Sequence, residues 1–168
     1  MAFLQIDYKS EALMRGVNIK VILPSDGMAG KWEPPYKTLY LLPGYSATAT
    51  ELITYLGLRG QSELKGIAIV LPDGENLFYQ DLPDRMTFYS TYVGKELVEV
   101  TRKMLPLSTK REDTFIGGIS MGGYGALYNG FKYRDTFSKV VAFSPAADAC
   151  MLLAGSEAPG FSRAQFEG

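Results

Sequence analysis

Short apolar runs that end at turn residues divide the chain into a regular series of predicted elements. The first two runs, FLQIDY (3–8) and VNIKVILP (17–24), are separated by only a short turn. Strands joined in this way pair antiparallel. The sequence therefore predicts an antiparallel pair at the N-terminus.

Four later runs lack polar alternation, as is typical of strands that are buried on both faces. They are KTLYLLPG (37–44), GIAIVLPD (66–73), DTFIGGIS (113–120) and KVVAFSPA (139–146). Three helices are expected between them. One begins at the capping box from Thr48 to Glu51 and carries Leu52, Tyr55 and Leu56 on one face; one carries Val93, Leu97, Val100 and Met104; and one starts just after Ser120. This alternation predicts a single α/β domain over 1–168, built on a mostly parallel, doubly wound sheet.

Composition narrows the classes of function. The chain of 168 residues is 46% hydrophobic, which suffices for one globular core, and its 17 Lys and Arg nearly balance 18 Asp and Glu. This balance gives no reason to expect nucleic acid or an anionic membrane as partner, and it suits a small neutral ligand.

Cysteine and histidine usage excludes further classes. The single cysteine, Cys150, cannot form an internal disulfide, and with no histidine the usual zinc spacings are absent, so no metal is expected. Neither a signal peptide nor an uninterrupted membrane-spanning stretch is present, which makes a cytoplasmic protein the default expectation.

The candidate chemistry lies in TFIGGISMGGYGALYNG (114–130), where Ser120 is the centre of a G-x-S-x-G pentapeptide. An apolar strand enters the motif and a helix rich in small residues leaves it, which is the setting of a nucleophile elbow. Gly118 and Gly122 stand where side chains would collide in so sharp a turn. The alternatives are a closely packed glycine turn or a phosphate site at a helix N-terminus, but no Walker lysine and no dinucleotide fingerprint is present.

Acyl transfer also requires hydrogen-bond donors for an oxyanion, and backbone N–H groups are the usual source. One donor is expected at Met121, directly after the serine. The second is expected at Tyr45, in the loop LLPGYSATAT, where Gly44 lets the backbone approach the substrate closely. A plain strand-exit turn would explain the Pro-Gly pair equally well.

Several segments together resemble the tributyrin esterase branch of the esterase D and S-formylglutathione hydrolase family. They are YLLPGYSATATEL, VLPDGENLFY, FYSTYVGKELVEVTRKMLPL, STKREDTFIGGISMGGYGAL and FSKVVAFSPA, in this order. The resemblance implies the α/β-hydrolase fold and hydrolysis of small acyl esters or thioesters without metal or organic cofactor. It names Ser120 as nucleophile and the N–H groups of Tyr45 and Met121 as the oxyanion hole.

The chain departs from the family in two respects. Pro43 stands where the family usually has a histidine before the oxyanion-loop glycine, which puts the geometry of that loop in question. The family's catalytic Asp and His follow two further strands, and neither is found here. We therefore interpret the chain as the N-terminal part of a serine carboxylesterase, inactive alone, because a serine hydroxyl needs a base.

Other groups are poor substitutes for that base. Lys132 and Lys139 lack the Ser-x-x-Lys spacing of the serine-lysine enzymes. Asp148 follows the sixth strand, where some hydrolases of this fold keep their acid, but without a histidine to orient it is expected to cap a helix or lie in a solvated loop. The aromatic residues of the loop between Leu77 and Tyr92 are interpreted either as walls of a substrate pocket or as ordinary packing; they are Phe78, Tyr79, Phe88 and Tyr89.

The strand at 140–143 is apolar on both faces, so a partner is expected along it. The missing C-terminal segment is the first candidate and another copy of the chain is the second. Two other functions stay open: an acyltransferase that uses the same serine, and a non-catalytic binding module.

Overall fold

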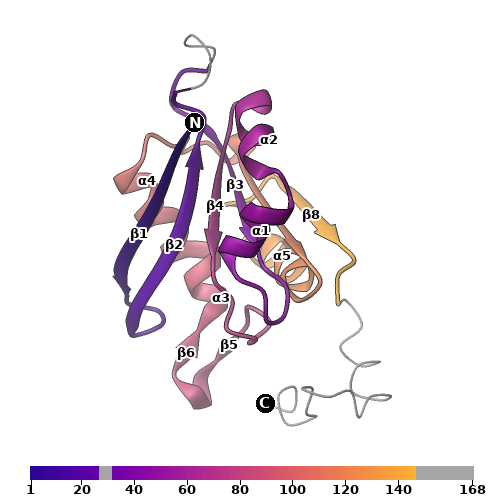
Figure 1. Ribbon diagram of the computed structural model, residues 1–168. Coiled ribbons are helices and arrows are strands. Elements are labelled where there is room, and N and C mark those ends of the chain that lie inside the picture. Colours follow the sequence, from indigo (N-terminus) through magenta and orange to yellow (C-terminus); the bar gives the residue numbers. More distant parts are fainter. Residues whose placement is uncertain (27–31, 147–168) are drawn as a thin grey trace.

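A six-stranded sheet with the order β1-β2-β4-β3-β7-β8 forms the centre of the molecule in the computed structural model, which describes residues 1–26 and 32–146 (Figure 1). Its strands are β1 (Ala2–Ser10), β2 (Arg15–Leu23), β3 (Lys37–Leu42), β4 (Ile67–Pro72), β7 (Thr114–Ile119) and β8 (Lys139–Phe143). β1, β2 and β4 pair antiparallel, whereas β4, β3, β7 and β8 are parallel. The predicted N-terminal antiparallel pair and mostly parallel sheet are confirmed.

Helices cover both faces of this sheet. In Figure 1, α1 and α2 lie in front of it and α4 and α5 lie behind it. The helical segments are α1 (Ala49–Tyr55), α2 (Leu58–Lys65), η1 (Pro83–Arg85), α3 (Tyr89–Thr91), the π-helical η2 (Tyr92–Glu96), α4 (Leu97–Met104), η3 (Arg111–Asp113) and α5 (Met121–Lys132). A small hairpin, β5 (Asp81–Leu82) with β6 (Thr87–Phe88), lies in the loop after β4 and was not predicted.

Side-chain alternation along the buried strands builds one core on each face. In β4, Val70 belongs to the cluster under α4 and α5, while its neighbour Ile69 belongs to the cluster under α1 and α2. In β3, Tyr40 and Leu41 divide in the same way. Continuous apolar strands thus serve two helix layers, as parallel sheets require.

The predicted helix faces are partly wrong. The capping box at Thr48 and Glu51 is present. Tyr55 and Leu56, however, are 79% and 44% exposed, because α1 ends after two helical turns and these last residues point away from the sheet. On α4, Met104 is 46% exposed and Thr101 is fully buried instead. The Thr101 hydroxyl hydrogen bonds to the Tyr40 hydroxyl at 2.8 Å, which makes its burial favourable.

Strand β8 is the last strand in the sheet order, so its outer edge has no strand partner among residues 1–26 and 32–146. Val141 and Phe143 are 44% and 56% exposed on one face of this strand. The sequence placed this apolar strand inside a sheet; here it is paired on one side only, with β7.

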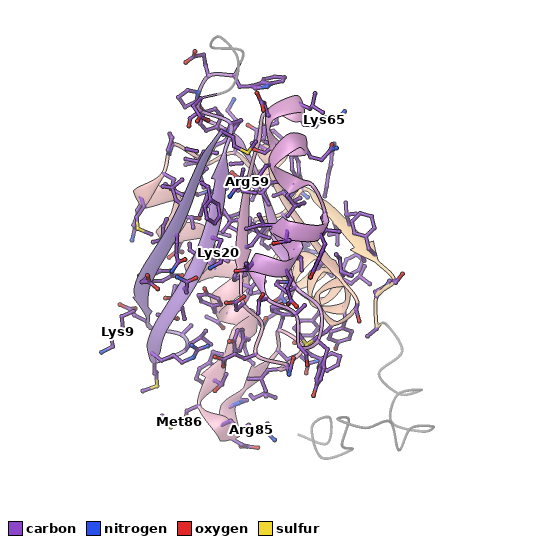
Figure 2. All side chains as sticks on the ribbon, viewed as in Figure 1. Lys9, Lys20, Arg59, Lys65, Arg85 and Met86 are labelled. Atoms are coloured by element: carbon purple, nitrogen blue, oxygen red, sulfur yellow. The ribbon has the colours of Figure 1, made fainter. Side chains whose placement is uncertain are left out.

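The basic side chains labelled in Figure 2 are spread over separate elements. They are Lys9 on β1, Lys20 on β2, Arg59 and Lys65 on α2, and Arg85 on η1. Arg59 lies over the Phe3 ring, with 4.9 Å from the guanidinium carbon to the ring centroid. No helix within the described ranges has the length and apolar character that crossing a membrane requires.

Candidate active site

Ser120 lies at the turn between β7 and α5, at the carboxyl ends of the parallel strands. Its backbone has φ 55° and ψ −116°, a left-handed conformation that costs a non-glycine residue about 1–3 kcal/mol. The residue is exposed. The strand-turn-helix setting expected from the sequence is therefore present, and the serine at its turn is strained and exposed.

The two glycines of the pentapeptide allow this turn. A Cβ built on Gly118 would lie 2.0 Å from the carbonyl oxygen of Gly122. A Cβ on Gly122 would lie 2.0 Å from the carbonyl oxygen of Leu42, at the end of β3. Because both obstacles are backbone atoms, no side chain can be accommodated at either position, which confirms the expected collision.

Hydrogen bonds on both sides hold the Ser120 backbone. Its N–H donates to the carbonyl of Phe143 at 3.0 Å, and its carbonyl accepts from the N–H groups of Tyr124 at 3.0 Å and Ala146 at 3.1 Å. β8 and the residues after it thus fix the turn from one side, while α5 fixes it from the other.

The loop that follows β3 approaches Ser120 directly. A Cβ on Gly44 would lie 3.2 Å from the Ile119 carbonyl oxygen and 3.4 Å from the Ser120 Cβ, so the loop and the serine turn are in contact. The loop is closed by a hydrogen bond from the Ala47 N–H to the Gly44 carbonyl at 3.2 Å. The Ser46 N–H donates to Asn76 Oδ1 at 2.6 Å, which ties the loop to the one after β4.

The two expected oxyanion donors lie on these two segments. Tyr45 follows Gly44, and Met121 is the first residue of α5. The first N–H groups of a helix have no carbonyl partner within it, and they lie at the positive end of the helix dipole. An anion that develops beside Ser120 would therefore meet favourable electrostatics from α5.

An aromatic wall borders the loop. The ring centroids of Tyr45 and Phe78 are 6.4 Å apart, and those of Phe78 and Tyr124 are 5.8 Å apart. Gln80 Nε2 donates to the Tyr124 hydroxyl. Burial raises the pKa of Tyr124, although the Gln80 hydrogen bond lowers it, so this hydroxyl stays protonated. The sequence analysis missed Tyr124; its position one helical turn after Ser120 is the signal that could have identified it.

Two of the four loop aromatics are not available as pocket walls. Tyr79 and Tyr89 are 0% and 1% exposed and pack edge to face, with their ring centroids 6.2 Å apart, inside the core cluster under α4 and α5. For these two residues the packing interpretation is correct. Phe78 is buried as well but contacts Tyr45 of the oxyanion loop.

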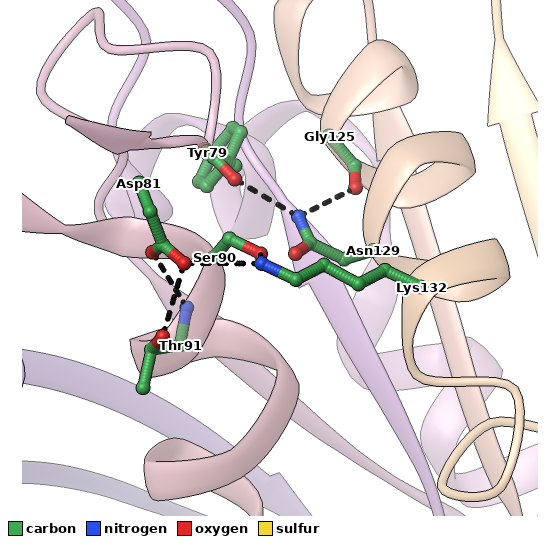
Figure 3. Close-up of polar contacts among 7 residues, drawn as sticks. All are labelled: Tyr79, Asp81, Ser90, Thr91, Gly125, Asn129 and Lys132. Carbon is green, nitrogen blue, oxygen red and sulfur yellow. Dashed lines mark hydrogen bonds and ion pairs between the residues drawn. The ribbon is translucent and has the colours of Figure 1, made fainter.

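Neither nearby lysine is a base for Ser120. Lys132 donates to Asp81 Oδ2 at 3.0 Å and to Ser90 Oγ at 2.9 Å (Figure 3). Partial burial lowers its pKa, but the hydrogen bond and charge of Asp81 outweigh this effect and the pKa is raised, so the amine remains protonated. Lys139 lies at the start of β8, at the opposite end of the parallel strands from Ser120, with its Nζ 5.6 Å from the Phe115 ring centroid. Asp148 and Cys150 lie outside the described residues.

A cavity of about 490 Å³ lies on the α2 side of the sheet and reaches the end of β7. Its lining is almost wholly apolar and includes Leu41, Leu58, Ile119 and Phe143. Within the ranges 1–26 and 32–146, no group of three or more His, Cys, Asp or Glu side chains could hold a metal ion.

Comparison with known proteins identifies the family. Residues 10–165 match the family described as "Putative esterase". The chain is 40% identical over 151 residues to an acetyl esterase of Caldicellulosiruptor saccharolyticus, an alignment that covers 87% of this chain and 57% of the relative. It is 29% identical to the S-formylglutathione hydrolase of Paracoccus denitrificans, over 83% of this chain and 56% of that protein.

Solved structures agree in fold. FphF, a fluorophosphonate-binding serine hydrolase of Staphylococcus aureus, superimposes with a TM-score of 0.85 at 30% identity, covering 96% of this chain and 64% of that one. The S-formylglutathione hydrolase FrmB of the same organism gives a TM-score of 0.79, also at 30% identity, over 92% of this chain and 61% of FrmB. The fold is thus that of the α/β hydrolases, as expected, and the chain spans about three fifths of the length of these relatives.

Proposed function

This chain belongs to the esterase family, and we propose that it carries the nucleophile and oxyanion hole of a serine carboxylesterase that acts on small, short-chain acyl esters. The observation that carries the proposal is Ser120, which is exposed at φ 55° on a strand-to-helix turn with the Gly44 loop against it. Its relatives include an acetyl esterase and an S-formylglutathione hydrolase by name.

Ser120 Oγ forms a bond to the ester carbonyl carbon, and the π electrons of the carbonyl move onto its oxygen. The N–H groups of Tyr45 and Met121 stabilise the resulting oxyanion. When the intermediate collapses, the bond to the leaving oxygen breaks and the alcohol departs with the proton that the serine lost. Water then attacks the acyl-enzyme, which releases the carboxylic acid and restores the serine hydroxyl. No cofactor enters this sequence.

The proton acceptor is proposed to be a histidine, oriented by an aspartate, from sequence outside these 168 residues. The chain contains no histidine. Lys132 is engaged by Asp81 and Ser90, and its raised pKa disqualifies it as a base. The same outside segment would also pair with β8 along 140–143, with a second copy of the chain as the alternative occupant of that edge.

The aromatic wall favours substrates with a small acyl group. The Phe78 ring contacts both Tyr45 of the oxyanion loop and Tyr124 on α5, and rings held this way cannot readily move apart for a bulky acid. Short linear esters are accordingly the substrates to test first.

The test compares the isolated chain with a completed protein, in which the chain is fused to the C-terminal segment of the Caldicellulosiruptor acetyl esterase beyond the matched region. The fusion is expected to hydrolyse p-nitrophenyl acetate, whereas the isolated chain retains only a residual rate, several orders of magnitude lower. Ser120→Ala in the fusion should abolish turnover.

Ser25→Ala is the matched control, since Ser25 is also exposed but follows β2, which ends beside the amino ends of the parallel strands, far from the Ser120 turn. Equal turnover in the Ser120→Ala and Ser25→Ala fusions would overturn the proposal. Normal enzymatic rates in the isolated chain, lost with Ser120→Ala, would refute the assignment of the base to another segment. Transfer of the acyl group to an added alcohol rather than to water would identify an acyltransferase.

A further inference from the structure

Tyr79 connects the two segments that form the proposed oxyanion hole. Its side chain is fully buried, and its hydroxyl donates a hydrogen bond of 2.8 Å to the carbonyl oxygen of Pro43. Pro43 immediately precedes Gly44 in the loop that contacts Ser120. The Tyr79 backbone carbonyl accepts a hydrogen bond of 3.1 Å from Asn129 Nδ2 on α5, the helix that begins at the serine turn (Figure 3).

Two glycines leave the space that the Tyr79 side chain occupies. A Cβ on Gly125, in the middle of α5, would lie 2.4 Å from Tyr79 Cδ2. A Cβ on Gly74, in the loop after β4, would lie 2.2 Å from the Tyr79 hydroxyl oxygen. Glycine inside a helix costs roughly 1 kcal/mol relative to alanine, so the position of Gly125 needs a reason, and the ring against it provides one.

The backbone at Tyr79 is itself held in an unfavourable conformation. Its φ is 58°, and that of Phe78 is 54°. Asn129 counters this strain, because Nδ2 donates both to Tyr79 and, at 2.9 Å, to the Gly125 carbonyl. The Asn129 Oδ1 atom is buried without a partner among the described residues, so the contribution of this side chain rests on its two donors.

A second anchor fixes the same loop one helical turn further along α5. Asp81 accepts hydrogen bonds from Lys132 Nζ at 3.0 Å and from the Thr91 N–H at 2.9 Å. Residues 79 and 81 are thus fastened to residues 129 and 132, which leaves the Tyr79 hydroxyl little freedom to follow a moving Pro43.

The identity of residue 43 makes this bond important. Proline has no N–H, so the carbonyl is the one backbone group of Pro43 that can be held by a hydrogen bond. Burial raises the pKa of Tyr79 well above its ordinary value, so the hydroxyl remains a donor throughout the neutral range.

We infer that Tyr79 is a positioning residue, which holds the Pro43–Tyr45 segment in register with the Ser120 turn by its hydrogen bond to the Pro43 carbonyl. This inference rests on the proposed function of the site. Tyr79 does not touch substrate; it sets the distance between the Tyr45 N–H and the Met121 N–H.

The first test is Tyr79→Phe in the isolated chain, followed by amide hydrogen exchange. The Ser46 and Ala47 N–H groups report on the loop, since each has a defined acceptor. Their exchange should become at least about tenfold faster relative to the amides of β3 and β4, because the loop then opens locally. Tyr40→Phe is the matched control, because the buried Tyr40 hydroxyl bonds to Thr101 and not to the loop. Loss of this hydroxyl should leave the exchange rates of the loop amides, relative to those of β3 and β4, at their wild-type values.

The second test uses the fusion protein. Tyr79→Phe should lower kcat by about tenfold or more with KM changed by less than about twofold, because a misplaced donor weakens transition-state binding alone. Tyr40→Phe should leave kcat near the wild-type value. If the two variants agree in loop exchange and in kcat, the inference is wrong. If Ser120→Ala keeps its activity, the proposed function fails instead, whatever Tyr79 does.

Discussion

Gly44 and Ser120 face each other so closely that a methyl group on the glycine would lie 3.4 Å from the serine Cβ and 3.2 Å from the Ile119 carbonyl oxygen. The loop after β3 and the turn after β7 therefore form one surface, although 76 positions separate them in sequence. Each of the following predictions probes how tightly this surface, or the sheet that supports it, is constrained.

Gly44→Ala should impair chemistry more than folding. The added methyl group displaces the loop by a few tenths of an ångström, which should lower kcat/KM of the completed enzyme about tenfold while costing less than about 1 kcal/mol in the free energy of unfolding. Gly60→Ala is the control, since nothing lies within 4 Å of a Cβ at that helical position. It should leave activity unchanged and raise stability by about 0.5–1 kcal/mol. Equal activity of Gly44→Ala and Gly60→Ala would show that the contact between the Gly44 loop and the Ser120 turn does not constrain the chemistry.

Ser120→Gly should be more stable than Ser120→Ala by about 1 kcal/mol, because glycine relieves the left-handed backbone at φ 55°. Urea unfolding of the two variants measures the difference. Ser25 is not among the residues with positive φ. At that position the alanine variant, Ser25→Ala, should be more stable than Ser25→Gly. A Ser120→Gly variant no more stable than Ser120→Ala would show that the turn is not strained.

Stability should fall as the pH rises from about 10 to about 12. Burial raises the pKa of Tyr40 from 10.0 to about 12, and burial also raises that of Tyr8 to about 12. In this window the unfolded chain loses phenolic protons that the folded chain keeps, so unfolding becomes more favourable; below pH 10 both states are protonated and the contribution is fully present.

Urea unfolding at several pH values checks this slope. Tyr40→Phe should reduce the loss between pH 10 and 12 by about 2 kcal/mol, since one buried phenol no longer titrates. If the stability of Tyr40→Phe falls with pH as steeply as that of the wild type, the loss cannot be assigned to the Tyr40 phenol.

The exposed side of β8 should promote self-association of the isolated chain. Val141 and Phe143 present apolar side chains beside an edge that has no strand partner among residues 1–26 and 32–146, and such edges pair readily with other strands. Val141→Lys should shift sedimentation velocity profiles toward monomer at every concentration. Leu64→Lys replaces a side chain that is 62% exposed on α2 and should not do so. A wild-type chain that stays monomeric at high concentration would contradict this expectation.

Local signals in the sequence determined most of the elements and the serine turn. The apolar runs of β3, β4 and β7 identified strands buried on both faces, because helices pack against both sides of such strands and most of their side chains must be apolar. The capping box at Thr48 and the glycines beside Ser120 were likewise readable, since each satisfies a steric or hydrogen-bonding need within a few residues. The position of Met121 after the serine and of Tyr45 after Gly44 suggested them as oxyanion donors, and the family resemblance named the same residues; their roles remain proposals.

Only the tertiary structure decided which side chains meet across the chain. The π-helical stretch at η2 and the Tyr40–Thr101 hydrogen bond place Thr101 rather than Met104 in the core, and no heptad-like spacing reveals this. The bond from Tyr79 to Pro43 joins residues 36 positions apart. Its formation depends on the strand order that brings two loops to one edge of the sheet, and on two glycines that leave room for the ring, Gly74 in the same loop as Tyr79 and Gly125 on α5. Such contacts are set by the packing of the whole fold, which periodicity along the sequence does not encode.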